Sequence, residues 1–550
     1  MKKLVLAGAA LAVGAAVAWS YRTELMLGVV KFQSDREYPI AENREIQWQQ
    51  GPAEAANEKQ PPNIVVIMLD DVGYNDISAI GTGVANGALK TPSIDALAQQ
   101  STVFTNGYAG NATCAPSRAM TMTGRYPTST GFEFTPFPGS SKTIAAVANS
   151  LNAPGEPETR ASDANSTPYA EQGLPGSEQT IAEMLATKGY HNVHIGKWHL
   201  GRSAESSPNA QGFDESLLMQ SGLYLPEEHP DVVNAKIDFD PIDRFLWARL
   251  RYAASYNNPT IDPKTSDAFE PRGYITDYYT EEAVKVIHAN KNRPFFLYLA
   301  HWGIHTPLQA TVDDYEAVGD IKPHRLRVYA AMMRSLYRSV EKVMQALEDA
   351  GVADNTMVIF TNDNGAPGYV GLSELNAPYR GWKLSFFEGG IKVPYFVKWP
   401  KGVDAPAVSD VPVGHIDILP TIAAITGAAP EAKIDGIDLL AMVNERQPEI
   451  RPLFFQSGFL QAVRYGQHKL MRSQLQNKIW LFDLENDPTE QVNLAEQRPE
   501  LVAELAKMID DHQAQGVGAL YPYSLEAPIA IDKTLDQPVE DNDEVVYWAN

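Results

Sequence analysis

The sequence predicts an α/β protein with a large central sheet, mixed but mostly parallel, flanked by helices and followed by a smaller C-terminal α+β subdomain. Short apolar runs such as NIVVIMLDD (63–71) and TMVIFTNDNG (356–365) end in polar residues, as buried central strands do at the edge of a sheet. Helical patterns lie between such runs, for example RVYAAMMRSLYRSVEKVMQALEDAG (327–351). Strands that alternate with helices indicate a sheet covered on both faces.

The first 20 residues carry an export-like pattern. Met1-Lys2-Lys3 precedes a stretch without charge from Leu4 to Tyr21, which contains the small-residue sequence AVA at 16–18. This pattern fits a secretory signal peptide, and the run is also long enough for a marginal membrane anchor. Its richness in Ala and Gly favours the cleaved signal. We therefore expect an exported protein, periplasmic or secreted, which an uncleaved segment would tether to the membrane.

The main domain is predicted over residues 62–425, after a polar linker or arm at 21–61. Further strand-like runs occur at 192–201, 294–307 and 393–400, and SEQTIAEMLATKG (177–189) has a helical pattern. Two long stretches, 132–176 and 221–272, interrupt the alternation, and loops of this length usually cover functional sites.

The C-terminal subdomain is predicted over residues 426–550. Its strand-like runs are shorter, namely PLFFQSG, HKLMRS and IWLFDLEND, and a helical pattern follows near 498–515. We expect a small antiparallel sheet, one helix and a polar tail.

Composition excludes some classes of partner. The 550 residues carry a formal net charge of −23, whereas a nucleic-acid-binding protein normally presents a basic face. The chain has a single cysteine, Cys114, so no intramolecular disulfide can form. Nothing in the sequence indicates an oligomeric state.

Oxygen-bearing side chains follow two of the predicted strands. Asp70 and Asp71 end the first, and Asp363 and Asn364 end a later one. Either pair alone is typical of a capped turn, but together they predict a site for a hard divalent cation, calcium or magnesium. No Cys/His cluster has the spacing of a zinc site.

The segment GNATCAPSRAM (110–120) contains Cys114. A free cysteine is most often a small buried hydrophobic residue. Here, however, Pro116 and Ser117 favour the start of a helix, which places Cys114 beside backbone N–H groups that attract anions. Arg118 lies four residues further on and can turn back toward it.

Cys-x-Pro-Ser-Arg followed by TGRYP resembles the signature of the type I sulfatases, which include the arylsulfatases, in the alkaline phosphatase superfamily. Other segments are similar to sulfatase segments in the same order: NIVVIMLDDVGYND, LPGSEQTIAEMLATKGYHNVHIGKWHLG, TNDNG, RGWKLSFFEGGIKVP, HIDILPTIAAITG and LFDLENDPTEQVNLA. The resemblance spans residues 63 to about 510. It implies an alkaline phosphatase-like fold and a sulfuric ester hydrolase.

The resemblance also implies how the nucleophile and the metal are held. In the family, the motif's cysteine is converted after translation to formylglycine (3-oxoalanine), whose hydrate attacks the sulfur. Metal ligands are then expected to be Asp70, Asp71, Asp363, Asn364 and an oxygen of modified Cys114. All-oxygen ligation together with the family pattern favours Ca²⁺ over Mg²⁺.

Further roles are implied by the family pattern. Arg118 would steady the modified residue and the metal site, while Lys197 and His199 of GKWHLG would face the sulfate and the nucleophile. Lys383 would contact a sulfate oxygen, and His305 of HWGIHTP would protonate the leaving alcohol, with His301 as a neighbour in the pocket wall. Cationic groups suit this chemistry because negative charge builds on the bridging oxygen as the S–O bond breaks. A nearby base such as His199 would assist release of sulfate.

The expected substrate is a sulfated small molecule, such as an aryl sulfate, or a sulfated glycan. The expected partner is a formylglycine-generating (sulfatase-maturating) enzyme. Two alternatives stay open at this point: a phosphate mono- or diester or phosphonate monoester hydrolase of the same superfamily, and a non-catalytic binder of sulfated polysaccharide.

Overall fold

The computed structural model describes residues 22–550 except 38, 56–59, 138–139, 153–154, 163–166, 258–267, 404 and 445–449. The predicted signal peptide or anchor at 1–20 lies outside the described residues. Among the helices that are described, none has the length and apolar character needed to cross a membrane.

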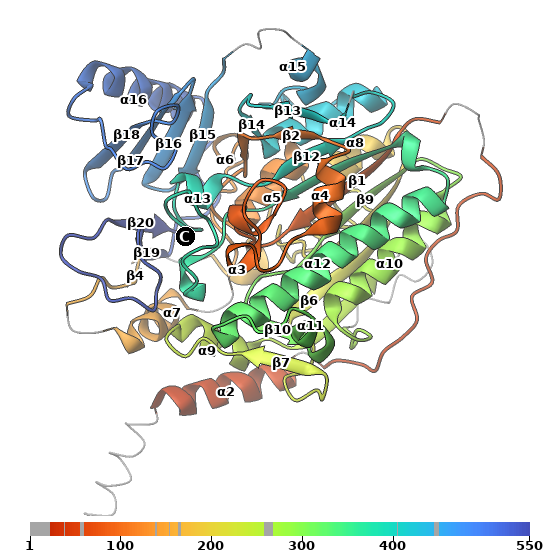
Figure 1. Ribbon diagram of the computed structural model, residues 1–550, viewed down its shortest axis with the longest axis horizontal. Coiled ribbons are helices and arrows are strands. Elements are labelled where there is room, and N and C mark those ends of the chain that lie inside the picture. The colour runs from red at the N-terminus through yellow and green to blue at the C-terminus, as the bar shows by residue number, and fades with distance from the viewer. Residues whose placement is uncertain are drawn as a thin grey trace, which may run out of the picture.

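A nine-stranded mixed sheet forms the centre of the molecule (Figure 1). Its strands, in spatial order, are β13 (Ala407–Ser409), β2 (Thr102–Phe104), β12 (Tyr395–Lys398), β11 (Thr356–Asn362), β1 (Asn63–Leu69), β9 (Phe295–Ala300), β5 (His191–Gly196), β6 (Glu215–Gly222) and β8 (Tyr252–Asn257). The inner strands β11, β1, β9, β5 and β6 are parallel to their neighbours, and β12 and β8 join them in the antiparallel sense. The predicted mixed, mostly parallel sheet is confirmed.

Helices cover both faces of this sheet. Val65, Ile67 and Leu69 of β1 belong to one core cluster, and Ile64 and Met68 belong to the other, because successive side chains of a strand point to opposite faces. The first face is covered by α4 (Pro92–Ala98), α10 (Ile275–Asn290) and α12 (His324–Asp349), and the second by α5 (Cys114–Thr123), α8 (Ile181–Ala186) and α14 (Ile418–Thr426).

Local sequence explains where α8 begins. The Thr180 hydroxyl accepts a hydrogen bond from the Glu183 backbone N–H (3.2 Å), and the Glu183 carboxylate accepts one from the Thr180 N–H (2.8 Å). This reciprocal cap satisfies two N–H groups that the first helical turn leaves free, so the helix starts at Ile181, inside the predicted 177–189 pattern.

A second sheet lies at the C-terminal side (blue in Figure 1). It is antiparallel, in the order β15 (Leu453–Ser457), β16 (Leu460–Tyr465), β17 (His468–Ser473) and β18 (Lys478–Asp483). Helix α16 (Pro499–Ala514) buries Leu505 and Ile509 against it. Strand β16 was not expected from the sequence, because its run LQAVRY is short and partly polar.

Two segments differ from the sequence-based expectation. The expected linker contains helix α2 (Arg22–Glu37), which packs beside α9 (Pro241–Arg249). The expected polar tail contains β19 (Leu525–Ala530) and β20 (Val545–Ala549), which form a three-stranded sheet with β4 (Arg160–Ala161). Strand β19 pairs with β4, which lies more than 350 residues away in the sequence, and Trp548 of β20 is buried in the core, so local composition gave no sign of this sheet.

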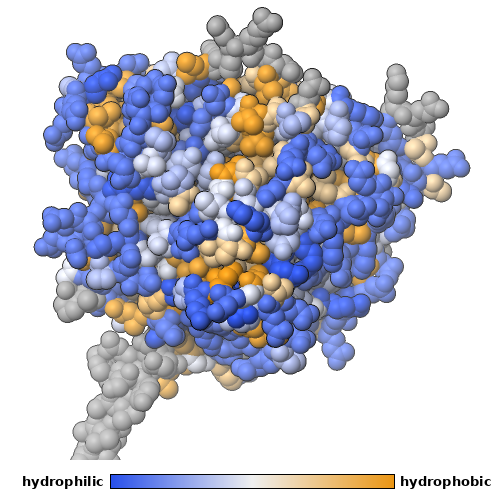
Figure 2. Space-filling view, viewed as in Figure 1, coloured by the Kyte–Doolittle hydropathy of each residue, from blue (hydrophilic) through white to orange (hydrophobic). Residues whose placement is uncertain are grey.

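The remaining short elements connect these layers. They are α3 (Val84–Gly87), α6 (Pro127–Thr130), α7 (Ser141–Ala148), α11 (Val312–Ala317), α13 (Glu388–Ile391), α15 (Leu439–Asn444), β3 (Gly107–Tyr108), β7 (Val232–Ala235), β10 (Leu308–Thr311) and β14 (Val413–Gly414). The face shown in Figure 2 is mostly hydrophilic, with smaller hydrophobic areas between the charged ones.

Candidate active site

The predicted site residues follow the ends of neighbouring parallel strands. In the register of the sheet, Leu69 of β1 pairs with Asn362 of β11, and Met68 pairs with Ala300 of β9, which in turn pairs with Gly196 of β5. The residues directly after these strands are therefore Asp70–Asp71, Asp363–Asn364, the segment 301–305, and Lys197. Parallel strands bring their carboxyl ends, and the residues next in the chain, to one edge of a sheet.

Arg118 holds two of the carboxylates together. It is fully buried on α5; its Nε donates to Asp363 Oδ2 (2.9 Å) and its Nη2 donates to Asp70 Oδ2 (3.1 Å). Its Nη1 donates to the backbone carbonyl of Lys197 (3.0 Å). One side chain thus connects the ends of β1, β11 and β5, as the sequence-based role of a steadying residue requires.

Cys114 is the first residue of α5 and lies among these groups. Its Sγ is 3.6 Å from Asp70 Oδ1 and 3.3 Å from Lys383 Nζ. Burial, with Asp363 as a further cause, raises the pKa of the Cys114 thiol well above its usual value. Because the thiolate is the reactive form of cysteine, an unmodified thiol at this position is a poor nucleophile.

Asp71 accepts hydrogen bonds from three directions. Lys383 Nζ lies 2.8 Å from its Oδ1, Asn364 Nδ2 donates to the same oxygen (2.7 Å), and the Tyr369 hydroxyl donates to its Oδ2 (3.1 Å). Burial opposes ionisation, but Lys383 and His305 outweigh it and keep the pKa of Asp71 below its usual value. Asp71 also has a φ of 60°, a strained conformation of the kind that occurs at functional sites.

The acidic cluster has the donor set of a hard-cation site. One ligand atom from each of Asp70, Asp71, Cys114 and Asp363 lies within 4.8 Å of the others, and all four residues are buried. Asn364 Oδ1 is also buried and accepts no hydrogen bond from the described residues. Buried carboxylates around an amide oxygen that lacks a partner match the oxygen ligation of Ca²⁺ or Mg²⁺, so these residues fit a divalent metal.

Repulsion within the cluster affects its protonation. Burial and the neighbouring Asp363 raise the pKa of Asp70 to about 7. A bound divalent cation would favour the ionised form of each carboxylate, so metal binding here is coupled to the release of protons.

Two lysines add positive charge to the cluster, each beside a different carboxylate. Lys197 Nζ lies 2.6 Å from Asp70 Oδ2 and 4.7 Å from the centroid of the Trp302 ring. Lys383 Nζ contacts both Asp71 and Cys114. Both side chains are almost completely buried, so the positive charge is held inside the site instead of being solvated.

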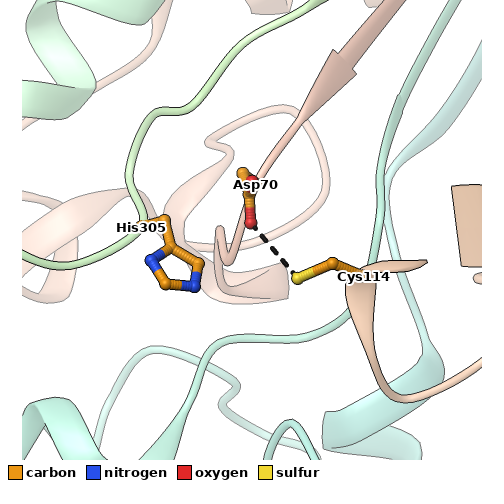
Figure 3. A group of neighbouring side chains, drawn as sticks. All are labelled: Asp70, Cys114 and His305. Carbon is orange, nitrogen blue, oxygen red and sulfur yellow. Dashed lines mark hydrogen bonds between the residues drawn. The ribbon is translucent and has the colours of Figure 1, made fainter. Parts of the chain in front are cut away.

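His305 faces the cluster through one ring nitrogen. Its Nδ1 donates to the backbone carbonyl of Thr306 (2.8 Å), which leaves Nε2 directed at Asp71 Oδ2, 3.6 Å away. The ring stacks on Trp302 with centroids 4.0 Å apart. Figure 3 shows His305 and Cys114 on either side of Asp70. Burial and the Lys383 charge lower the pKa of His305 to about 3, so the ring is neutral at pH 7 even beside Asp71.

The other two histidines of the motifs differ from each other. His199 is half-buried with a φ of 63°, and its buried Nδ1 has no hydrogen-bond partner among the described residues. Burial and Lys197 hold its pKa well below the usual value, so it is available as a neutral base. His301 instead binds Ser339 of α12 through Nε2 (2.9 Å) and is fully buried.

Three residues of the site were not singled out from the sequence. Tyr369 contacts Asp71, Trp302 lies between Lys197 and His305, and His415 bridges Ser117 Oγ and Thr361 Oγ1 at 3.0 Å each. Trp302 and His415 stand inside motifs recognised above, which is a signal that could have identified them. Tyr369 lies in a loop with no pattern of its own.

The Lys383 loop approaches the end of β11 closely. A Cβ at Gly365 would lie 1.8 Å from the Gly389 carbonyl oxygen, so only glycine allows the two backbones to pack at this distance. The contact brings the Asp363–Asn364 turn and the loop that carries Lys383 to the same site.

Comparison with known proteins agrees with this geometry. A family model described as Sulfatase matches residues 62–428, and one described as N-sulphoglucosamine sulphohydrolase, C-terminal, matches residues 381–515. The chain is 32% identical over 425 residues to N-acetylgalactosamine-6-sulfatase of Homo sapiens, covering 76% of this chain and 72% of that protein. It is 30% identical to an arylsulfatase of Hemicentrotus pulcherrimus, covering 74% and 67%.

Solved structures have the same architecture. The crystal structure of Ps i-CgsB in complex with k-i-k-neocarrahexaose matches with a TM-score of 0.68 and 29% identity, covering 84% of this chain and 95% of that chain. A phosphonate monoester hydrolase of Agrobacterium radiobacter matches with a TM-score of 0.57 and 17% identity, covering 83% and 96%, a similarity that extends to the fold alone.

Proposed function

The chain belongs to the sulfatase family, as a type I sulfatase of the alkaline phosphatase superfamily, and from this premise we propose that it desulfates a sulfated carbohydrate with a nucleophile made from Cys114. It is a sulfuric ester hydrolase; the carbohydrate, the modification and the residue roles are the proposal. The single observation that carries it is the position of Cys114, which lies between Asp70 and Lys383 in a buried cluster of carboxylates and cations.

Conversion of Cys114 to formylglycine accounts for the chemistry of its surroundings. The buried thiol has a raised pKa and therefore little nucleophilic character. A formylglycine hydrate carries two hydroxyl groups. One would act as the nucleophile, and the other would lose its proton as the aldehyde re-forms and the bond to sulfate breaks. This proposal implies a formylglycine-generating enzyme as a partner, acting on the segment around Cys114 before folding buries it.

The proposed metal ligands are Asp70, Asp71, Asp363, Asn364 and the modified side chain at position 114. A divalent cation would supply Lewis-acid stabilisation of the negative charge that develops on the sulfate. Asn364 Oδ1 lacks a hydrogen-bond partner among the described residues, which supports its proposed role as a metal ligand. Ligation by oxygen atoms alone favours calcium, with magnesium as the alternative. Removing metal with a chelator should abolish turnover, and restoring activity with each ion separately identifies the metal.

The cationic side chains hold the substrate's sulfate. Lys197 and Lys383 reach the cluster from two sides and can hold a sulfate ester while neutralising the charge that builds during S–O cleavage. Arg118 contacts two carboxylates and a backbone carbonyl, so it is proposed to keep the ligands and position 114 in place.

Proton transfer is assigned to two histidines. His305 Nε2 points at the site, and a bound sulfate ester would raise the pKa of this ring, allowing it to protonate the leaving alcohol. His199 lacks a hydrogen-bond partner at Nδ1 among the described residues and has a depressed pKa, which suits the base proposed for sulfate release.

Sulfated carbohydrate is the proposed substrate class because two kinds of relative indicate it. Curated relatives are named N-acetylgalactosamine-6-sulfatase, and a structural neighbour is bound to k-i-k-neocarrahexaose. An aryl sulfate is the small-molecule alternative, suggested by the arylsulfatase relative. The apolar N-terminal segment supports a further proposal, that the enzyme is exported to the periplasm or secreted.

One comparison of substrates tests the assignment. The catalytic efficiency, kcat/KM, is measured on an aryl sulfate, on the matching aryl phosphate and phosphonate, and on N-acetylgalactosamine 6-sulfate. We expect desulfation of the sugar and a clear preference for sulfate over phosphate. A large preference for phosphate or phosphonate would overturn the proposal, and so would a complete lack of sulfated-sugar turnover across a panel of glycans.

A further inference from the structure

A second charged cavity lies where the C-terminal sheet meets the α/β domain. Its volume is about 510 Å³. One wall comes from the α/β domain, with Tyr108 of β3 and Lys392 after α13. The other wall comes from Arg464 of β16 and from Arg451, which lies two residues before the start of β15. None of the residues proposed for the active site lines it.

Arg464 is the most unusual group in this cavity. Only 6% of the residue is exposed, and its Nε is buried without a hydrogen-bond partner among the described residues. Its guanidinium lies over the Tyr108 ring, 5.4 Å from the centroid. Buried guanidinium groups are normally paired, because desolvating a charge without hydrogen bonds is costly. Arg464 therefore indicates a partner that enters from the cavity.

Arg451 presents a second guanidinium to the same space. Leu453 is the cross-strand partner of Arg464, and Arg451 precedes Leu453 by two residues. Because alternate residues of a strand share a face, an extended chain directs both arginines toward the cavity. The Nη2 of Arg451 pairs with Asp417, but the Nε of Arg451 is buried and has no hydrogen-bond partner in the described part of the chain.

Lys392 completes the set of cations. It is 6% exposed, with Nζ 3.0 Å from Asn106 Oδ1 and 3.8 Å from Glu388 Oε2. Glu388 cannot balance all three cations, because it already accepts from Lys469 (2.8 Å) and from the Tyr108 hydroxyl (2.8 Å).

Three acidic side chains line this cavity, and among them only Glu388 is buried. Asp410 and Glu485 also line it, but both are exposed and their charge is screened by water. Arg464, Arg451 and Lys392 therefore outnumber the single buried carboxylate that lines the cavity.

We propose that this cavity is a second oxyanion-binding site, which holds a sulfate group of a polysulfated glycan outside the catalytic centre. Guanidinium groups bind the oxygens of such tetrahedral anions through paired hydrogen bonds. Arg464 and Arg451 would each direct a free N–H at the anion, and Lys392 would add a point charge. The identity of the glycan rests on the proposed function, whereas the anion site itself does not. The site would tether a sulfated chain whose other end is processed, raising its effective concentration at the enzyme.

The test uses the intact protein and two probes, inorganic sulfate and a sulfated oligosaccharide, with binding followed by calorimetry. Turnover is prevented in this experiment by the Cys114→Ala background. We expect two sulfate-binding events, one of which disappears in Arg464→Gln, together with about tenfold weaker binding of the oligosaccharide, equivalent to one lost charge-assisted pair. Arg464→Lys keeps the charge and should retain part of the affinity.

Controls separate this proposal from the proposed function and from misfolding. With Cys114 present, Arg464→Gln should leave kcat/KM on an aryl sulfate within about twofold and raise KM for the sulfated oligosaccharide. Lys478→Gln removes an exposed positive charge from the same sheet and should change neither binding event. If Arg464→Gln unfolds, Lys392→Gln replaces it, with the same expected losses.

Two results would overturn the proposal. Unchanged sulfate stoichiometry in a folded Arg464→Gln protein excludes an anion site. Loss of the inorganic sulfate event with no change in oligosaccharide affinity assigns the cavity to free sulfate and contradicts a glycan site. An enzyme inactive on all sulfate esters that still binds sulfate here would refute only the proposed function.

Discussion

Two buried clusters of charge in this molecule differ in how completely their groups are paired. Around Cys114, three carboxylates meet Arg118, Lys197 and Lys383, yet Asn364 Oδ1 and His199 Nδ1 are left without partners among the described residues. The second cluster is built on Lys469 of β17. Its Nζ lies 2.9 Å from the Phe386 carbonyl, 2.8 Å from Glu388 Oε1 and 2.6 Å from Glu490 Oε1.

This difference in pairing indicates that the Cys114 cluster binds ligands and that the Lys469 cluster stabilises the fold. An ammonium group has three donors, and Lys469 Nζ has a protein oxygen within 2.9 Å for each of them. Glu490 meets Lys469 as an ion pair through Oε1 and accepts the Glu388 N–H through Oε2. Buried polar atoms that lack both an ion pair and a hydrogen bond, by contrast, indicate a ligand or a catalytic role. The two clusters are connected through the chain, because Phe386 and Glu388 follow shortly after Lys383. The Lys469 cluster thereby anchors the Lys383 loop to the C-terminal sheet.

The largest expected effect is at Cys114. Cys114→Ala should lower kcat by at least about 10⁴-fold, because it removes the precursor of the nucleophile. The thermal midpoint should change little, since the substitution removes only the functional group at the end of one small side chain. Steady-state turnover of an aryl sulfate, measured with the unfolding transition, checks both statements; residual activity within tenfold of the wild type would refute the assignment.

Lys383→Met should lower kcat by about 100-fold or more, the usual cost of losing one charge-stabilising donor in an active site. Lys401→Met is the matched control, because Lys401 is exposed and its one hydrogen bond within the described part of the chain is to Asn355. Equal kinetics for the two variants would show that Lys383 takes no part in the reaction.

Lys469→Met tests the second cluster. Removing this cation leaves Glu388 and Glu490 buried without their partner, so the free energy of unfolding should fall by about 3 kcal/mol or more. Lys478→Met, on the neighbouring strand, breaks a partly exposed pair with Glu544 and should cost less than about 1 kcal/mol. Chemical denaturation of both variants measures the contrast. A loss below that of the control would contradict a structural role for Lys469.

The smallest effect concerns His301 of HWGIHTP. Burial lowers the pKa of His301 to about 3, so the folded protein keeps this ring neutral while the unfolded chain takes up a proton below about pH 6.5. The free energy of unfolding therefore falls with decreasing pH, and His301 alone accounts for about 2 kcal/mol between pH 6.5 and pH 5.

His301→Gln should remove this contribution, so denaturation curves of the wild type and the variant should differ in their dependence on pH over this range. Turnover of the variant at pH 7 should stay close to the wild-type value, since His301 binds Ser339 and not the reacting groups. If the free energy of unfolding of the variant changes with pH as steeply as that of the wild type, His301 is excluded as a source of the pH dependence.

The central sheet and the proposed site could be predicted from the sequence for one reason. The apolar runs identify the strands, and the polar residues at their ends identify the site. The runs before Asp70 and Asp363 are apolar and β-branched, and the register of parallel strands then forces the residues after them to one edge. Trp302, Tyr369 and His415 could not be assigned in the same way, because their contacts depend on the paths of loops. Strand β19 was not predicted for a related reason: besides β20 it pairs with β4, which lies more than 350 residues away in the sequence.

The mass of the peptide that contains Cys114, isolated from the enzyme made in its native host, tests the central claim most directly. We predict a peptide in which the thiol has been replaced by an aldehyde, in a fraction that rises in proportion to the specific activity of the preparation. A fully active enzyme whose Cys114 peptide carries only an unmodified thiol would contradict the account.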